Sequence, residues 1–478
     1  MKIAPFFVCL LTFASCNFAP KYTRPDVSLP STWRVTSDEY SELVNANWWE
    51  ELGDPTLTTL IQKALAHNND LQIAVWRVCQ YLAAYQVAKS PLLPQIGLNA
   101  AATKERLPVD ENFLPPGVSS LTPDYHMFLS LSYELDFWGK NRNIAAASHY
   151  EYLAQIENRR TVVLTLIGSV AESYILLRQL DLQLALALQI LRARTEALQI
   201  AIDRFEGGIT SKIEVDQARS VYEETLATVE ELKEKIPQQE NLLSVLIGQN
   251  PGSIPRGKAL NELMLPSKAP SCLPADLLSR RPDILRAENN LKAAHANIGI
   301  AKAAFFPQID FGAVYGIDSL QLKSLFQNSS RTWSLGGTLM QQIFAGGSLV
   351  GQLHVAEAQK QELLFSYEQT ILTALQEVDN SLIGLQQSKQ IFLADQRQVA
   401  ALKDYLQLAW DRYYEGQTQY LTVLNAEQEE LTAEMNMVTA QASQFLYLVA
   451  LYKALGGGWV TRADGTVPQE QSNSNMTP

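Results

Sequence analysis

The side chains that most often carry catalysis or bind metal are few in this sequence and are scattered along it. The histidines include no HExxH motif and no pair at the spacing that places two of them on one helix face, and the cysteines include no CxxC pair. These residues are His67, His126, His149, His295 and His354, with Cys9, Cys16, Cys79 and Cys272. We therefore predict that the protein is not an enzyme and needs no metal or dissociable cofactor.

Cys16 has a setting that indicates another kind of chemistry. Residues 1–15 combine one lysine, an apolar stretch and small residues directly before Cys16, which is typical of a bacterial export signal. Cleavage before Cys16 would make it the N-terminal residue, and the preceding residues resemble a lipoprotein signal, except that Phe13 stands where leucine is usual. We predict a covalent lipid at Cys16, with ordinary cleavage nearby as the alternative. Cys79 and Cys272 are predicted to be small apolar packing residues.

The composition limits the partners and the way in which the chain could cross a membrane. Of 478 residues, 47% are hydrophobic and 18% are charged, and the formal net charge is -12. An acidic protein lacks the basic face that nucleic acids require, so we predict no nucleic-acid partner. No run of about 18 consecutive apolar residues occurs, which predicts no transmembrane helix. Any membrane-spanning segment is therefore expected to be a β-strand.

The second half of the sequence repeats the first, and the repeat sets the domain organisation. Residues 70–96 align without gaps to residues 283–309, and residues 203–218 align in the same way to residues 411–426. A stretch rich in proline and glycine separates the halves. We predict a signal peptide at 1–15, a lipid-anchored N-terminal extension at 16–54, a first repeat at 55–249, a linker at 250–275, a second repeat at 276–459 and a disordered tail at 460–478.

Each half has the same predicted order of elements. A helix comes first and is ended by a proline, at 55–90 and at 282–304. Alternating apolar and small or polar residues then predict two strands per half, at 96–100, 127–133, 309–313 and 333–339, with loops at 108–125 and 317–331. Proline-free helices of about 60 residues follow, at 143–205 and 349–414. A shorter helix returns after a glycine-marked turn in each half, and Pro237 is expected to kink the first of these.

Helices of this length need partners, and four strands need further strands. Five residues of the second long helix follow the spacing of a coiled-coil seam: Ile371, Leu375, Val378, Leu382 and Leu385. Every sheet edge must be paired inside a membrane, and four strands are too few to close into a barrel. The pattern therefore predicts one barrel built by several chains. A soluble four-stranded sheet with one face on a core remains the alternative.

Several motifs carry a resemblance to a known family. They are Glu134-Leu135-Asp136-Phe137-Trp138-Gly139-Lys140, Arg280-Arg281-Pro282-Asp283-Ile284, Ala301-Lys302 with Phe305-Phe306-Pro307, Ile343-Phe344-Ala345-Gly346-Gly347 and the stretch from Tyr452 to Trp459. With them the chain resembles the outer-membrane factor (TolC-like) family. The stretch from Ala19 to Pro25 is similar to the NodT-type lipoprotein branch, which supplies the outer-membrane components of tripartite efflux pumps.

The resemblance implies a mainly α fold with membrane β: a long coiled-coil helical barrel continued by a twelve-stranded transmembrane β-barrel shared by three chains. It implies a homotrimer in the outer membrane, extending into the periplasm, that works with a periplasmic adaptor protein and an inner-membrane pump. The implied function is passive conduction of drugs and small toxic molecules to the exterior. A type I-like peptide or protein secretion duct of the same fold, and a poreless periplasmic coiled-coil protein, are the alternatives.

The resemblance also assigns candidate gate residues to the turns between the long and the returning helices, where the family's tunnel closes. Leu421 matches an apolar constriction, and Asn425 and Thr422 match positions where relatives commonly carry aspartate. That departure speaks against an aspartate ring at the second turn. The first turn keeps Glu214 and, close by, Asp216, which three chains would present as a cation-binding carboxylate ring. The alternative is that both are solvated residues near a helix start.

The turns themselves are expected to be sites of adaptor contact. Gly207, Gly208 and Gly416 are predicted to serve sharp turns or close approaches of the backbone. Arg204 and Arg412 each precede a turn. They either hold neighbouring helices together or only favour the negative end of a helix dipole.

Overall fold

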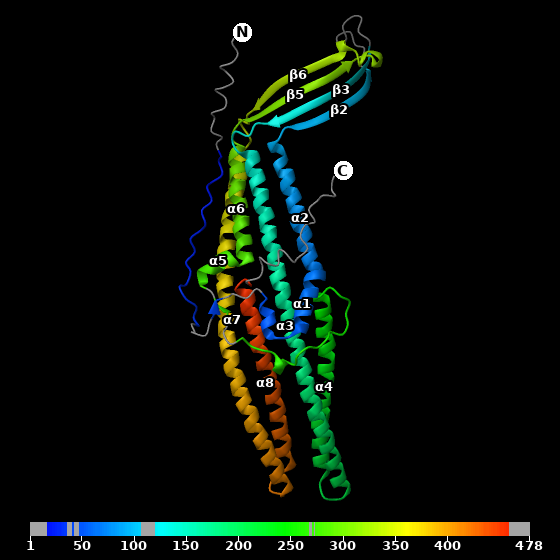
Figure 1. The fold of residues 1–478 in the computed structure, drawn as a ribbon, viewed down its shortest axis with the longest axis vertical. Coiled ribbons are helices and arrows are strands. Elements are labelled where there is room, and N and C mark those ends of the chain that lie inside the picture. The colour runs from blue at the N-terminus through cyan, green and yellow to red at the C-terminus, as the bar shows by residue number, and fades with distance from the viewer. Residues whose placement is uncertain are drawn as a thin grey trace. The chain divides into compact units, whose positions relative to one another are not determined.

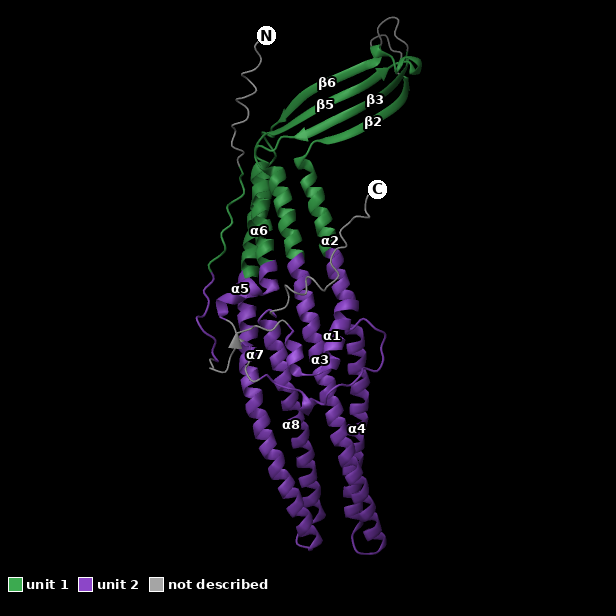
Figure 2. Ribbon diagram, in the orientation of Figure 1, with its two compact units in different colours: residues 1–26, 78–155, 287–367 green, residues 27–77, 156–286, 368–478 purple. Residues whose placement is uncertain are grey.

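The computed structural model describes residues 17–35, 41–42, 47–106, 120–266, 270–271 and 273–457. The chain divides into two compact units, each assembled from three stretches of sequence (Figure 2). Unit 1 comprises residues 1–26, 78–155 and 287–367, and unit 2 comprises residues 27–77, 156–286 and 368–478. Cys16, Cys272 and the tail at 460–478 lie outside the described residues.

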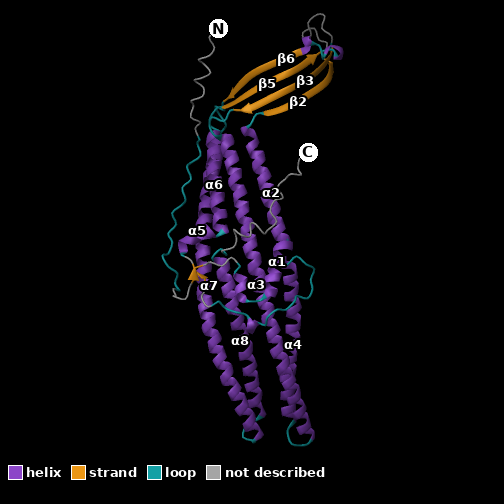
Figure 3. Cartoon of the chain, in the orientation of Figure 1, coloured by secondary structure: helices purple, strands orange, loops and turns teal. Residues whose placement is uncertain are grey.

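Most of the described chain is helical, and the strands of the large sheet all belong to unit 1 (Figures 1 and 3). The helices are α1 (Pro55–His67), α2 (Asn69–Lys89), α3 (Lys140–Glu206), α4 (Lys212–Leu246), α5 (Leu277–Arg280), α6 (Pro282–Ala303), α7 (Ser348–Tyr414) and α8 (Tyr420–Ala454). The strands are β1 (Ser41–Glu42), β2 (Gln95–Arg106), β3 (Leu121–Glu134), β4 (Pro270–Ser271), β5 (Gln308–Ser319) and β6 (Arg331–Met340). The expected long helices at 143–205 and 349–414 are confirmed as α3 and α7.

Four of these strands form one antiparallel sheet with the order β2-β3-β5-β6. All four predicted strands are present, and each is longer than its alternating pattern indicated. The predicted loops are correspondingly too long, because β3 begins at Leu121 and β5 continues to Ser319. Backbone pairing explains the extension, since Arg106 pairs with Leu121 and Tyr125 pairs with Ser319 beyond the alternating segments.

The first predicted helix, at 55–90, is wrong in one respect, because Asn68 interrupts it. Asn68 has extended backbone angles and separates α1 from α2. Its side-chain oxygen accepts a hydrogen bond from the Leu71 backbone amide at 3.0 Å, as the side chain of a helix N-cap does. Its side-chain nitrogen donates a hydrogen bond to the Leu246 carbonyl at 3.0 Å. A contact with the far end of α4 therefore fixes the break.

The interior of unit 2 is made by the long helices. Ile371, Val378, Leu382 and Leu385 of the predicted seam are buried, and Leu375 is half-buried, which confirms the seam. Pro237 lies inside α4, which continues through it. Because α4 begins after the predicted glycine turn and α8 after its counterpart, both returning helices are confirmed as well.

One described helix is apolar enough to cross a membrane by length and composition. An 18-residue window of α3 has a mean hydropathy of 1.4, so the lack of an unbroken apolar run in the sequence does not by itself exclude a candidate of this kind. A few polar residues interrupt the apolar run, but the apolar residues are numerous enough to keep the mean hydropathy at 1.4. Since 61% of the window is buried in the structure, packing inside the protein accounts for its apolar character.

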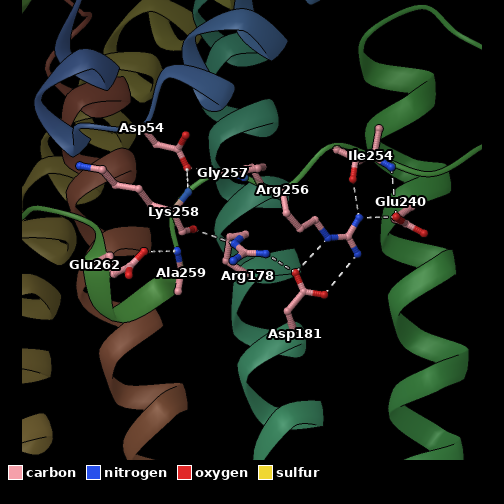
Figure 4. A network of polar contacts seen from close by, with 11 residues as sticks. Asp54, Arg178, Asp181, Glu240, Ile254, Arg256, Gly257, Lys258, Ala259 and Glu262 are labelled. Carbon is pink, nitrogen blue, oxygen red and sulfur yellow. Dashed lines mark hydrogen bonds and ion pairs between the residues drawn. The ribbon is translucent and has the colours of Figure 1, made fainter.

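The linker is held on unit 2 by a network of polar contacts (Figure 4). Arg256 bonds both oxygens of Asp181, at 3.0 and 3.2 Å, and also bonds Glu240 of α4. Arg178 of α3 binds the Lys258 carbonyl at 2.8 Å. Further contacts come from Asp54, whose carboxylate accepts from Thr56, Tyr174 and the Lys258 amide. The residues that connect the two halves are thus bound to the start of α1, to α3 and to α4.

In unit 1 the residues that directly follow Cys16 pack on the body of the unit. Phe18 stacks on Phe306 with ring centroids 4.4 Å apart. Tyr22 donates to Glu288 of α6 at 3.1 Å, and Arg24 binds the same carboxylate at 2.5 Å. These contacts fix the start of the described chain close to α6.

Candidate functional site

The two turns that end the long helices in unit 2 have the same backbone geometry. Gly208 and Gly416 have positive φ angles of 72° and 75°. In the first turn the Ile209 amide bonds the Arg204 carbonyl at 2.8 Å, and in the second the Gln417 amide bonds the Arg412 carbonyl at the same distance. A side chain at either glycine would meet nothing within 4 Å. Conformation alone therefore calls for glycine here, and no close approach of backbone is involved.

A three-residue chain of hydrogen bonds connects the two helical hairpins near these turns. Arg204 of α3 donates to the hydroxyl of Tyr413 of α7 at 2.7 Å, and its guanidinium lies over that ring at 5.2 Å from the centroid. Tyr413 in turn donates to Glu214 of α4 at 3.2 Å. Burial and the Glu214 charge raise the pKa of Tyr413, so its hydroxyl keeps the proton that it donates. We call these three residues the tip tether.

The tip tether gives two of the sequence's candidate residues a definite structural setting. Arg204 holds neighbouring helices together, whereas Arg412, its counterpart at the other turn, is exposed. Glu214 is half-buried and engaged with Tyr413, so it is not a freely solvated residue. Asp216 is exposed and makes no ion pair with the residues that the structure describes. The structure therefore separates the two acids that the sequence grouped together.

The candidate residues of the second turn lie at the start of α8. Leu421 is 44% exposed, and Asn425, one helical turn later, is also exposed. Thr422 is half-buried, and its hydroxyl accepts a hydrogen bond from the Thr418 hydroxyl at 2.9 Å. Leu421 and Asn425 are thus available on one face of α8, while Thr422 points elsewhere.

A buried arginine, which the sequence reasoning missed, lies farther along the same helices. Arg194 of α3 is 2% exposed. It donates to the Val221 carbonyl at 2.8 Å, to the Thr225 hydroxyl, and to Gln428 of α8 at 2.9 Å. Burial raises the pKa of the Glu427 carboxyl, and the nearby Arg194 opposes that rise. Arg194 therefore fastens α8 to the hairpin of α3 and α4.

Sequence signals for these two features were weak. Tyr413 occupies the position that Phe205 holds in the first half, so the added hydroxyl next to an arginine was the one available clue. Arg194 lies in a stretch of α3 with another arginine at 192, and nothing local distinguishes the buried one from the exposed one. Only contacts between distant helices reveal their roles.

The sheet of unit 1 presents one apolar and one polar face. Alternation along paired strands places the following residues on the first face: Ile96, Leu98, Ala100, Met127, Leu129, Leu131, Ile309, Phe311, Ala313, Tyr315, Trp333, Leu335 and Leu339. The opposite face carries, among others, Asn99, Ser130, Ser132, Asp310, Ser334 and Thr338. Leu98, Trp333 and Leu335 are 69%, 73% and 63% exposed. An uncovered apolar face of this extent needs an apolar surrounding.

Comparisons with known proteins agree with these features. The model of the outer membrane efflux protein family matches residues 60–249 and 273–457. The solvent efflux pump outer membrane protein SrpC of Pseudomonas putida is 36% identical over 474 residues, which cover 96% of this chain and 98% of that protein. The cation efflux system protein CusC of Escherichia coli is 32% identical over 467 residues, which cover 96% of this chain and 99% of that protein.

Solved structures give the same answer for the fold. The outer-membrane channel OprN superposes with a TM-score of 0.86 at 27% identity, covering 93% of this chain and all of that one. The open state of the MtrE channel of Neisseria gonorrhoeae superposes with a TM-score of 0.82 at 30% identity, covering 93% of this chain and 99% of that one. The chain belongs to the outer membrane efflux protein family.

Proposed function

We propose that three copies of this chain form an outer-membrane duct that passively conducts small toxic molecules out of the cell. A periplasmic adaptor protein and an inner-membrane pump deliver the cargo, so the duct itself needs no energy source. The observation that carries the proposal is the two-faced sheet of unit 1. Its apolar face suits lipid and its polar face suits a water-filled lumen, as in other transmembrane barrels.

The order of the strands supports a barrel shared between chains. Strands β2 and β6 lie at the two edges of the described sheet. Each leaves one row of backbone groups unpaired, which is costly in hydrocarbon. Pairing β6 of one copy with β2 of the next removes these edges, and three copies close a twelve-stranded barrel. The two repeats, at 55–249 and 276–459, would each supply two strands and one helical hairpin per chain.

The turns are the proposed gate and docking region of this duct. In the closed state the tip tether holds the two hairpins of each chain together, and Leu421, Thr422 and Asn425 lie where the tunnel narrows. Glu214 acts as an acceptor in the tether, and Asp216 is left to attract cations. The adaptor contacts the turns at Gly207, Gly208 and Gly416. Exposure of these turns in the single chain supports the assignment.

Subunit count and single-channel current test the proposal directly. The protein is purified from outer membranes in detergent, its mass is measured, and it is inserted into a planar lipid bilayer. A trimer with small, reproducible current steps is expected, because the tip tether keeps the duct nearly closed. A monomer that stays in solution without detergent and gives no current would contradict the proposal.

Asn425→Asp is expected to strengthen block of the current by multivalent cations roughly tenfold, because three added carboxylates form a ring around one axis. The measurement is the cation concentration that halves the single-channel current. Asn380→Asp is the control, since it adds the same three charges on an exposed part of α7 far along the chain from the turns. Equal cation block of the current in the two variants would show that Asn425 does not line the gate.

Cys16→Ala is expected to abolish labelling of the protein by radioactive palmitate while leaving the trimer intact, since the barrel itself inserts in the membrane. Cys16 lies outside the described residues, but the packing of Phe18 and Arg24 places the chain that follows it firmly on unit 1. Cys79→Ala, which removes a half-buried thiol of α2, is the control. Palmitate labelling that persists in Cys16→Ala would contradict lipidation at Cys16.

A further inference from the structure

The charged residues of the four-stranded sheet are sorted between its two faces. Side chains alternate along each strand, so the pairing of the strands assigns every one of them to a face. The five acids all lie on the polar face: Glu105, Asp124, Glu134, Asp310 and Asp318. The three lysines and arginines all lie on the apolar face: Lys104, Arg106 and Arg331. Opposite charges are thus kept apart by the thickness of the sheet.

The three basic residues also share one end of the apolar face. Lys104 and Arg106 are in the last three residues of β2, and Arg331 is the first residue of β6, so all three are at strand ends remote from the long helices. The opposite end of the same face carries only apolar or aromatic residues, such as Ile96, Tyr133 and Leu339. The basic residues therefore mark one side of a membrane and not the other.

Aromatic residues locate the membrane surface just inside this end. Trp333 lies two residues from Arg331, is 73% exposed, and pairs across the strands with Tyr315, which is 58% exposed. Tryptophan and tyrosine concentrate where hydrocarbon meets lipid headgroups. Side chains beyond Trp333 on this face therefore lie at the level of the headgroups.

Among the described residues, the three basic residues have no ion-pair partner. Lys104, Arg106 and Arg331 are all exposed. A cation on the lipid face is unfavourable at the bilayer centre and tolerated near its surface. A phosphate group there would supply the missing counter-charge, and the planar arginine fork matches its geometry.

We propose that Lys104, Arg106 and Arg331 form a binding surface for the phosphate groups of an anionic lipid headgroup in the outward-facing leaflet of the membrane. The proposal rests on the insertion of the sheet into the outer membrane. It goes beyond conduction, because it assigns a lipid partner to the outer wall of the barrel. With three chains the surface occurs three times, so the bound lipids form a ring that fixes the barrel's depth in the membrane.

Native mass spectrometry of the purified trimer with added diphosphoryl lipid A tests this surface, and phosphatidylcholine serves as the neutral lipid for comparison. The test variant combines Lys104→Gln, Arg106→Gln and Arg331→Gln. We expect it to lose about 100-fold in affinity for lipid A, at roughly fivefold for each cation removed near an anionic headgroup. Affinity for phosphatidylcholine should stay unchanged.

Two controls separate the charge effect from other causes. Arg192→Gln, Lys212→Gln and Arg219→Gln together remove the same charge from exposed helical positions of unit 2 and should leave lipid A binding unchanged. Lys104→Arg, Arg106→Lys and Arg331→Lys keep the charge and should retain most of the binding. Lipid A binding by the neutral variant at the wild-type level, or no preference for lipid A in the wild type, overturns the proposal.

The experiment also distinguishes failure of this inference from failure of the proposed function. If the trimer conducts ions in a planar bilayer but binds lipid A no better than phosphatidylcholine, the proposed duct stands and the proposed lipid-binding surface is wrong. If the protein neither inserts into the bilayer nor conducts ions, both the duct and the lipid-binding surface are wrong. Equal affinity for the monophosphoryl and diphosphoryl forms of lipid A would reduce the site to one phosphate per chain, contrary to the three-cation surface proposed.

Discussion

Replacing Arg204 by glutamine should open the duct, seen as a large rise in the open fraction of single-channel current. The substitution removes the hydrogen bond to the Tyr413 hydroxyl and the contact of the guanidinium with the ring. Together these contacts contribute on the order of 2 kcal/mol to the closed arrangement. Their loss is expected to shift the ratio of closed to open states by roughly 30-fold in each chain.

The second turn provides a matched control for this prediction. Arg412 occupies the equivalent position in the repeat but is exposed, so Arg412→Gln removes the same charge without breaking the tip tether. Tyr413→Phe keeps the ring and removes the hydroxyl that joins Arg204 to Glu214, so it should open the duct as well. Glu214→Gln keeps an acceptor for Tyr413 and should have a smaller effect. If Arg204→Gln conducted like the wild type and Arg412→Gln did not, the gate would have to be reassigned.

Replacing Arg194 by methionine should give the largest loss of stability of any substitution proposed for these helices. Arg194 is 2% exposed and bonds groups on α4 and α8. Methionine fills a similar volume but leaves Gln428 without its donor and the half-buried Glu427 without the charge that opposes its raised pKa. Removing one member of such a buried polar set costs roughly 3–5 kcal/mol.

The urea dependence of helical circular dichroism measures this loss in the detergent-solubilised trimer. Arg192→Met is the control, because Arg192 lies two residues away on the same helix and is exposed, so its loss should change the midpoint little. Equal midpoints for the two variants would show that Arg194 is not a fastening point between the hairpins. A lower urea midpoint in Arg194→Met alone would support the role of Arg194 in fastening α8 to the hairpin of α3 and α4.

Local patterns in the sequence were sufficient for most elements of the fold. The change of period from about 3.6 to two predicts where helices give way to strands, and the lack of proline over 143–205 and 349–414 predicts α3 and α7. These signals are carried by residues close together in the chain. Asn68 shows their limit, because an N-cap residue alone does not predict a break and its contact with the Leu246 carbonyl comes from a distant segment.

Some features of the candidate site follow from local sequence patterns, and others depend on contacts between distant segments. By itself the sequence determined the family motifs, the glycine turns at Gly208 and Gly416, and the alternation that gives the sheet two faces, since backbone geometry and side-chain period are local properties. Only the tertiary structure decided that Arg204 meets Tyr413 while Arg412 stays exposed, and that Arg194 is buried while Arg192 is not. The physical reason is that a charged side chain acquires its role from its partners, and here those partners lie on helices that folding alone brings together.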